Sequence, residues 1–247
     1  MRISGGDTQS TSPTNTETIA TNQTSTSTPT PSSDSAQKDN IASVVNIFCD
    51  NEGGGSGTIF SESGTIVTNN HVITGSSFCL VTLADTTTGT PTGIYLAKPE
   101  IVPQLSEQYD IALLNIYDAY TDSDGKVWGT YPRTFPAFKK PEICTDELPK
   151  LGDSIKIYGY PVTSGGYNLT ITEGVISSFA SDGNILTSAK IDSGNSGGLA
   201  VNQNGCIVGI PSAVLMGNYQ NLGVVIPPNI IVDFFDEAIN QLSTPTP

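Results

Sequence analysis

The stretch Asp192-Ser193-Gly194-Asn195-Ser196-Gly197-Gly198 sets a serine among glycines in the last quarter of a 247-residue chain. Glycine adopts positive φ angles at little cost, so the backbone around Ser196 is free to turn tightly and expose the hydroxyl. Tight turning also lets consecutive N–H groups converge on the point where an attacked carbonyl would become an oxyanion. An ordinary Gly-rich turn has the same composition, so the partners of Ser196 decide the interpretation.

The order of the histidine, the acid and the serine along the chain distinguishes between classes of serine site. The stretch also fits Gly-x-Ser-x-Gly, the nucleophile turn of α/β-hydrolases, in which the acid and the histidine follow the serine. His71, the only histidine, precedes Ser196, which leaves the orders His-Asp-Ser and Asp-His-Ser. The second order needs an aspartate well before His71, and the folded part offers only Asp50, in a Gly-rich loop. We therefore favour His-Asp-Ser.

Asp110 is the strongest candidate for the acid because it opens the apolar run Asp110-Ile111-Ala112-Leu113-Leu114. A carboxylate at the head of a buried strand is partly desolvated, which strengthens a hydrogen bond to an imidazole. His71 itself ends the β-branched run 65–68 and precedes a short apolar turn. Most of the other aspartates between His71 and Ser196 lie in polar, turn-like runs: Asp85, Asp118, Asp146, Asp153, Asp182 and Asp192.

Composition argues against several other classes of function. Lys plus Arg number 10 against 24 Asp plus Glu, a formal net charge of −14. That charge argues against DNA or RNA as a partner, since binding a polyanion depends on basic side chains. No apolar run approaches the roughly 18–20 residues that cross a bilayer. One histidine and no Cys-x-x-Cys pair leave no zinc site, and we expect neither a metal nor a cofactor.

Three regions are expected: a disordered linker at 1–40, one folded domain at 41–242 and a tail at 243–247. Residues 7–37 are more than half Ser and Thr and hold no aromatic residue, so they bury too little apolar surface to fold. Short β-branched runs with Gly-rich turns predict an all-β domain, a sandwich or a barrel. One C-terminal helix is predicted after the N-cap Asn229, with one apolar face formed by Ile231, Phe234, Phe235, Ala238 and Leu242.

Residues 118–141 are the least regular part and predict a long surface insertion. The strand candidates are Ala42–Phe48, Gly57–Phe60, Thr65–Thr68, Phe78–Leu83, Ile111–Ile116, Ser154–Tyr160, Leu169–Phe179, Ile185–Ala189, Cys206–Ser212 and Leu222–Ile226.

Four cysteines allow three pairings. Cys49 and Cys79 fall on predicted strands that flank the His71 segment, which makes their bridge plausible, and Cys144 with Cys206 would then remain. Four buried free thiols are the alternative. The first residues show no apolar signal-peptide region. We nevertheless favour an extracytoplasmic location (secreted, periplasmic or cell-surface), with the Ser/Thr-rich region as a stalk.

Taken together, these motifs resemble the trypsin-like serine proteases of chymotrypsin fold, and among them the HtrA/DegP type. The resemblance implies a double antiparallel β-barrel of six strands each, with the site between the barrels. The matching stretches run in family order from about residue 41 to 242: Gly55–Phe60, Thr68–Ile73, Asp110–Leu114, Ile171–Ser177, Gly194–Gly198, Gly209–Ala213 and Gly223–Pro227.

The resemblance implies a serine endopeptidase acting on polypeptides through an acyl-enzyme. His71 would be the general base, Asp110 its orienting partner and Ser196 the nucleophile, with the N–H groups of Gly194 and Ser196 as oxyanion hole. Lys190 would lie near the base of the S1 pocket, where it would favour an acidic P1 residue unless its head turns to solvent. HtrA-type proteases prefer small aliphatic P1 residues, for which Ile191 would supply an apolar wall. The strand pairing with the substrate backbone would contribute Ile210, Ser212, Ala213 and Val214.

Some features depart from the resembled family. HtrA-type proteins usually continue into one or two PDZ domains, whereas we expect only a protease domain within the given sequence; either a PDZ domain was trimmed or the protease stands alone. Asn195 stands where digestive members carry the aspartate that pairs with a newly cut N-terminus, so we expect no activation by clipping. A homo-oligomer is left open, because no trimerisation element is recognisable in 1–40. The alternative function is a catalytically silent peptide-binding module, although such proteins normally lose a triad residue or an oxyanion-hole glycine.

Overall fold

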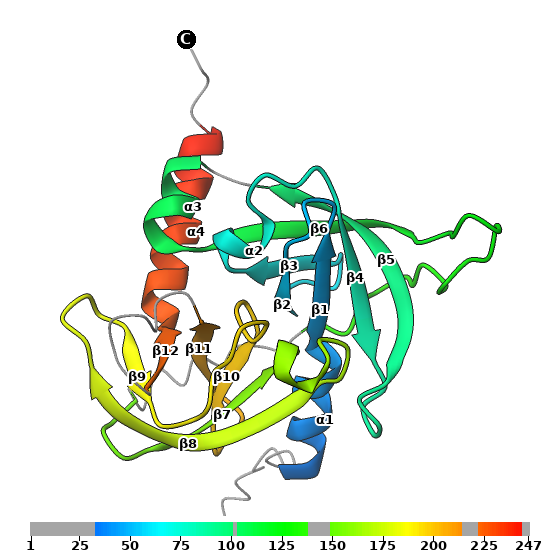
Figure 1. The fold of residues 1–247 in the computed structure, drawn as a ribbon. Coiled ribbons are helices and arrows are strands. Elements are labelled where there is room, and N and C mark those ends of the chain that lie inside the picture. The colour runs from blue at the N-terminus through cyan, green and yellow to red at the C-terminus, as the bar shows by residue number, and fades with distance from the viewer. Residues whose placement is uncertain (1–32, 101–102, 138–148, 214–221, 244–247) are drawn as a thin grey trace, which may run out of the picture. The chain divides into compact units, whose positions relative to one another are not determined.

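A computed structural model describes residues 33–100, 103–137, 149–213 and 222–243. Within these residues the chain forms two closed antiparallel barrels of six strands each, followed by a C-terminal helix (Figure 1). The expected all-β double barrel is confirmed.

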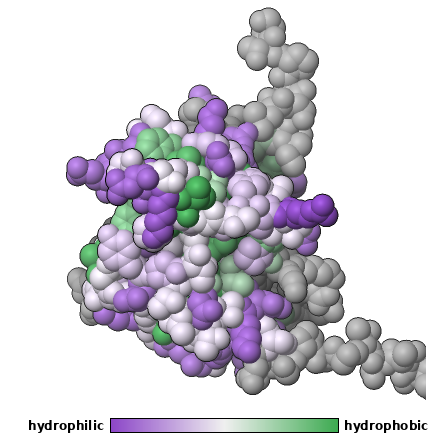
Figure 2. All heavy atoms as spheres, turned by 90° about the vertical axis from the view of Figure 1, so that its right-hand side faces the viewer, coloured by the Kyte–Doolittle hydropathy of each residue, from purple (hydrophilic) through white to green (hydrophobic). Residues whose placement is uncertain are grey.

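The first barrel follows the strand order β1-β2-β3-β6-β5-β4. Its β-branched and aliphatic side chains point inward and are removed from water, among them Ile47, Ile59, Ile66, Val81 and Leu114. The strands are β1 (Val44–Cys49), β2 (Gly54–Ile59), β3 (Thr65–Thr68), β4 (Cys79–Ala84), β5 (Pro91–Glu100) and β6 (Ala112–Ala119). The face that carries β4 and β5 is largely hydrophilic, with scattered hydrophobic areas (Figure 2).

The second barrel follows the order β10-β11-β12-β9-β8-β7 and has its own aliphatic interior, which includes Ile155, Ile157, Ile176 and Val208. Its strands are β7 (Ser154–Gly159), β8 (Thr170–Phe179), β9 (Ile185–Thr187), β10 (Leu199–Asn202), β11 (Ile207–Ser212) and β12 (Gly223–Ile226).

Two further apolar clusters join the barrels and so fix the junction at which the site lies. In one, Ile41 and Val44 pack with Tyr158 and Leu199 of the second barrel. In the other, Val67 of β3 packs with Ile210 of β11 and with the C-terminal helix. Burial of apolar area at both places holds the ends of β3 and β11 close together.

The helices are short except the first and the last: α1 (Ser33–Ser43), α2 (Asn70–Ile73), α3 (Pro103–Tyr109), the 3₁₀ turn η1 (Val162–Ser164) and α4 (Pro228–Ser243). α3 and α4 lie side by side (Figure 1), joined by a 3.0 Å hydrogen bond from the Tyr109 hydroxyl to Glu237. Ile231, Phe234 and Ala238 form the buried face of α4, as the periodicity predicted. None of the described helices is long and apolar enough to span a membrane.

The structure differs from the predictions at several places. The strands β5 and β10 were not among the predicted strands. Residues 33–40, predicted as linker, belong to α1, because Ile41 and Val44 anchor the end of that helix in the cluster between the barrels. α4 begins at Pro228, so Asn229 is inside the helix; a proline fits the first helical position, where no N–H is needed. The predicted insertion carries a short bridge, Thr121 to Val127. Residues 1–32 and 244–247 lie outside the described part.

Candidate active site

His71 and Asp110 meet although 39 residues separate them in sequence. The ring Nδ1 of His71 lies 2.9 and 3.0 Å from the two carboxylate oxygens of Asp110, and the His71 backbone N–H donates to Oδ1 at 3.2 Å. An ionised carboxylate only accepts hydrogen bonds, so Nδ1 carries the proton and Nε2 is left as an acceptor. The next residues of α2, Val72 and Ile73, are buried and fix the helix on the first barrel.

Asp110 is itself held from several sides. The Ser212 hydroxyl donates to its Oδ2 at 3.1 Å, and the Asn69 side-chain amide donates to its carbonyl at 2.8 Å. Its backbone has a φ of 53°, a left-handed conformation that aspartate tolerates better than most residues. The carboxylate is 18 % exposed and stands just before β6, where the apolar run predicted it.

Ser196 is almost fully buried, and its Oγ accepts a 3.0 Å hydrogen bond from the backbone N–H of Ala213. Among the described residues, no hydrogen bond joins Ser196 to His71. The consecutive residues Ser212 and Ala213 nevertheless contact Asp110 and Ser196 respectively, so the serine and the His–Asp pair share the end of β11. The sequence analysis did not predict that Ser196 Oγ would accept the Ala213 N–H.

Residues 192–198, hereafter the serine loop, have three consecutive carbonyls that are each fixed. In a trans peptide the N–H points away from the preceding carbonyl, so those bonds also direct the N–H groups of Gly194 and Ser196. Neither of these two N–H groups donates to another described residue. The three bonds run from Val162 N–H to Ser193 at 2.8 Å, from Ser56 Oγ to Gly194 at 2.6 Å and from Gly198 N–H to Asn195 at 3.0 Å.

Two glycines of the serine loop are required by its conformation. Gly194 has a φ of +97° and Gly197 a φ of +84°, where a side chain is strained. A Cβ at Gly194 would overlap the Tyr160 carbonyl, and one at Gly197 would overlap the Ser56 carbonyl. The glycines therefore allow the close approach that positions Ser196, but the serine is buried and not exposed as the sequence analysis predicted.

The residues assigned to substrate binding fall in different surroundings. The Lys190 ammonium lies 2.8 Å from Asp192 Oδ2, with the lysine side chain 69 % exposed. Ile191 belongs to the core of the second barrel and faces Gly223, whose missing side chain leaves it room. The remaining residues are found as follows: Ile210 and Ser212 are buried, Ala213 is half-buried, and Val214 lies outside the described residues.

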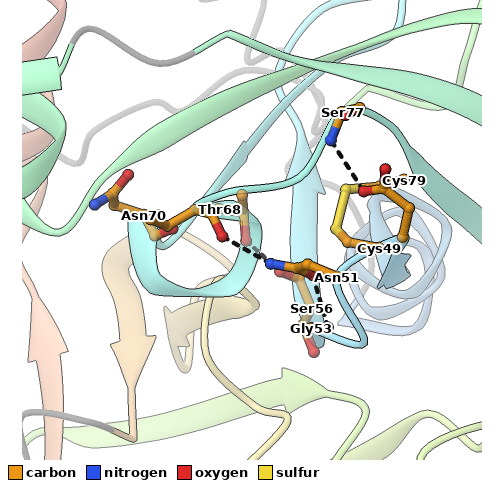
Figure 3. Close-up of a disulfide and its surroundings, with 10 residues drawn as sticks. Cys49, Asn51, Gly53, Ser56, Thr68, Asn70, Ser77 and Cys79 are labelled. Carbon is orange, nitrogen blue, oxygen red and sulfur yellow. Dashed lines mark hydrogen bonds between the residues drawn. A yellow bond between two sulfur atoms is a disulfide. The ribbon is translucent and has the colours of Figure 1, made fainter.

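The disulfide between Cys49 and Cys79 is confirmed (Figure 3). It closes the segment that holds β2, β3 and α2, and so encloses His71. Cys206 is also disulfide-bonded, and Cys144, its predicted partner, lies outside the described residues.

Polar contacts support the same segment beside the disulfide. The Asn51 amide donates to the Thr74 carbonyl at 2.7 Å, which ties the loop after β1 to the end of α2. Asp50, the alternative acid, accepts the Ser77 N–H at 2.9 Å and makes no contact with His71 among the described hydrogen bonds.

Three residues around the serine loop escaped the sequence analysis: Ser56, Thr163 and Asp192. Ser56 was noted only as part of a family stretch, although a small hydroxyl inside a buried strand is a signal of a specific hydrogen bond. Asp192 was assigned to a solvated turn. Thr163 carried no signal, since its contact with Asp192 joins residues 29 apart.

The two barrels, with a glycine-bracketed serine and a His–Asp pair at their junction, have the architecture of trypsin-like proteases. The chain belongs to the Trypsin-like peptidase domain family, whose model matches residues 55–210. It is 30 % identical over 196 residues to the periplasmic serine endoprotease DegP of Salmonella typhimurium, covering 75 % of this chain and 35 % of that protein. It is 32 % identical over 204 residues to the serine protease Do-like HtrA of Lactobacillus helveticus, covering 76 % and 43 %.

A solved structure agrees with these relatives. The serine endoprotease from Yersinia pestis superposes with a TM-score of 0.63 at 26 % identity, covering 87 % of this chain and 68 % of that one. The resemblance to the HtrA/DegP type is thereby confirmed. The chain spans less than half the length of the two curated relatives.

Proposed function

We propose that this chain is a serine endopeptidase that cleaves polypeptides through an acyl-enzyme. The observation that carries the proposal is the bond of His71 Nδ1 to both Asp110 oxygens, at the end of β11 where Ser196 lies. Two N–H groups without a partner among the described residues, those of Gly194 and Ser196, supply the oxyanion hole. Membership of the family and the endoprotease names of the relatives support the same activity.

In the first half of the reaction, Ser196 Oγ turns from the Ala213 N–H towards His71 Nε2. His71 takes the hydroxyl proton as Oγ bonds to the substrate carbonyl carbon, and Asp110 stabilises the imidazolium that forms. The N–H groups of Gly194 and Ser196 hold the negative oxygen. When the C–N bond breaks, His71 gives its proton to the leaving amine, and an ester at Ser196 remains.

The second half reverses these roles with water. His71 removes a proton from a water molecule as its oxygen attacks the ester carbonyl, and the same oxyanion hole holds the second tetrahedral intermediate. Collapse returns the proton to Ser196 Oγ and releases the new carboxyl end of the peptide. No group beyond this chain and water is needed to balance the reaction.

For the substrate, we infer that the end of β11, at Ser212 and Ala213, pairs with the peptide backbone. An S1 pocket beside Ile191, which packs in the core of the second barrel, would have an apolar wall, and the Lys190 charge is engaged by Asp192. Small apolar P1 residues are therefore favoured over acidic ones. An extracytoplasmic location fits the periplasmic relatives and the disulfides, which persist in oxidising compartments.

The test is cleavage of β-casein by the purified chain, together with labelling by a fluorophosphonate probe. We expect both without prior proteolysis, and neither in Ser196→Ala. Ser63→Ala, in the exposed hairpin between β2 and β3, is the matched control and should behave like the wild type. Binding of casein peptides with neither cleavage nor labelling would instead establish the silent peptide-binding module.

A further inference from the structure

We propose that Asp192 is a positioning residue that fixes the serine loop in its catalytic form, a role that rests on the proposed endopeptidase activity. Its carboxylate Oδ2 receives two groups, the Lys190 ammonium at 2.8 Å and the Thr163 hydroxyl at 3.1 Å. Its backbone carbonyl accepts the Asn195 N–H at 3.0 Å. Asp192 thus connects the serine loop to η1, which follows β7 in the chain.

The connection matters because η1 controls one peptide group of the oxyanion hole. Val162, next to Thr163, donates its N–H to the Ser193 carbonyl at 2.8 Å. That bond turns the Gly194 N–H to the opposite side, where the oxyanion would form. If the peptide between Ser193 and Gly194 rotated, a carbonyl oxygen would replace the N–H and repel the oxyanion.

Such a rotation has little intrinsic barrier in this loop. Gly194 lacks a side chain and stands at a φ of +97°, so its backbone has more accessible conformations than any other residue would have. Asn195 stands where a digestive protease would carry an acid for its new N-terminus. In place of that ion pair, the contacts that lead from Asp192 through Thr163 to Val162 restrain the peptide between Ser193 and Gly194.

Lys190 contacts the same Asp192 carboxylate that accepts the Thr163 hydroxyl. Its side chain is 69 % exposed and that of Asp192 is 26 % exposed, so the ion pair lies at the surface of the loop. The ammonium neutralises a carboxylate that would otherwise oppose the developing oxyanion. Lys190 therefore supports turnover of every substrate and does not select acidic P1 residues.

The experiment compares kcat and KM of full-chain variants on a peptide with Val at P1. Asp192→Ala should lower kcat about tenfold and leave KM within about twofold, a fraction of the loss caused by deleting a whole oxyanion-hole donor. Thr163→Val should lower kcat several-fold, whereas Thr163→Ser keeps the hydroxyl and should stay near wild type. Asp182→Ala, which removes a carboxylate from the turn between β8 and β9, is the matched control.

The possible results distinguish failure of the endopeptidase proposal from failure of the positioning role of Asp192. A wild-type chain that neither cleaves nor labels overturns the endopeptidase proposal itself. An active wild type overturns the positioning role alone if Asp192→Ala matches Asp182→Ala in kcat, if only KM rises, or if Thr163→Ser loses as much as Thr163→Val. Lys190→Ala is a second test of the positioning role. Equal losses of kcat on P1-Val and P1-Glu peptides would support that role. A changed ratio of activity on the P1-Glu and P1-Val peptides would instead show that Lys190 selects the substrate.

Discussion

The Ser56 hydroxyl of the first barrel donates a 2.6 Å hydrogen bond to the Gly194 carbonyl of the second. It also accepts the Tyr160 N–H at 2.9 Å, and the Ser56 backbone N–H donates to the Ser196 carbonyl at 2.8 Å. Ser56 is fully buried, so water does not compete for these bonds. One residue of β2 thus fixes the serine loop and the residue that follows β7.

Replacing Ser56 by alanine should therefore reduce both stability and turnover. The change leaves the Gly194 carbonyl and the Tyr160 N–H unpaired in a buried place, which costs about 1–3 kcal/mol for each such group. We expect a lower free energy of unfolding in urea and a kcat about tenfold below wild type. Ser63→Ala should change neither quantity. A Ser56→Ala variant with full kcat would show that the hydroxyl has no part in positioning Gly194.

Asp110→Asn tests the partner of His71 directly. The asparagine amide cannot hold the Nδ1 proton with two anionic oxygens, so the imidazole loses its preferred tautomer and the imidazolium its counter-charge. By analogy with other serine proteases, kcat should fall by about four orders of magnitude. Asp118→Asn, an exposed change in β6, is the control and should keep full activity. A loss of less than about tenfold in Asp110→Asn would point to another acid.

Ser212→Ala should have a smaller effect of the same kind. The Ser212 hydroxyl donates to Asp110 Oδ2 at 3.1 Å and helps to orient the carboxylate, while the two contacts with His71 Nδ1 remain. We expect kcat to fall several-fold with KM nearly unchanged. The measurement is a kcat and KM comparison on the P1-Val peptide. A rise in KM alone would assign Ser212 to substrate binding only.

Activity should fall as the solution is acidified, because a doubly protonated His71 cannot accept the serine proton. The fluorescence emission of Trp128, the only tryptophan, distinguishes this loss of activity from unfolding. Its indole N–H donates to Asp122 at 2.7 Å, and that bond holds the pKa of the carboxyl below its usual value. The bond favours the ionised form, so its stabilisation is present above the usual pKa and is lost only at lower pH.

Trp128 emission should accordingly stay constant over the range in which casein cleavage disappears. Asp122→Asn provides the control, since it should alter the emission and leave the pH profile of cleavage in place. Activity that stays constant on acidification would contradict His71 as the base. An emission change that follows the activity loss would instead show that the fold changes first.

The sequence predicted the contact between His71 and Asp110 because the types and order of these residues leave few arrangements. A single histidine upstream of Ser196, and a single aspartate at the head of an apolar run, allowed one pairing, and His71 and Asp110 are in contact. Contacts such as Ser56 with Gly194 span 138 residues and depend on how two barrels pack. The local sequence pattern carries no information on contacts between residues so far apart in the chain. Nor does it show that the Ser196 hydroxyl points towards the Ala213 N–H.

The Cys49–Cys79 bridge should contribute stability mainly by restricting the unfolded chain. It spans 30 residues, for which the loop-closure model gives about 3–4 kcal/mol. The enclosed segment holds His71 on α2, so Cys49→Ser/Cys79→Ser should lower the midpoint of urea unfolding while the refolded protein keeps its labelling at Ser196. A thiol assay on the denatured protein verifies the variant if it counts two fewer oxidised cysteines than in the wild type. Four free thiols in the denatured, unreduced wild type would refute the bridge, and an unchanged midpoint would mean that the contacts of Asn51 and Asp50 already fix the segment.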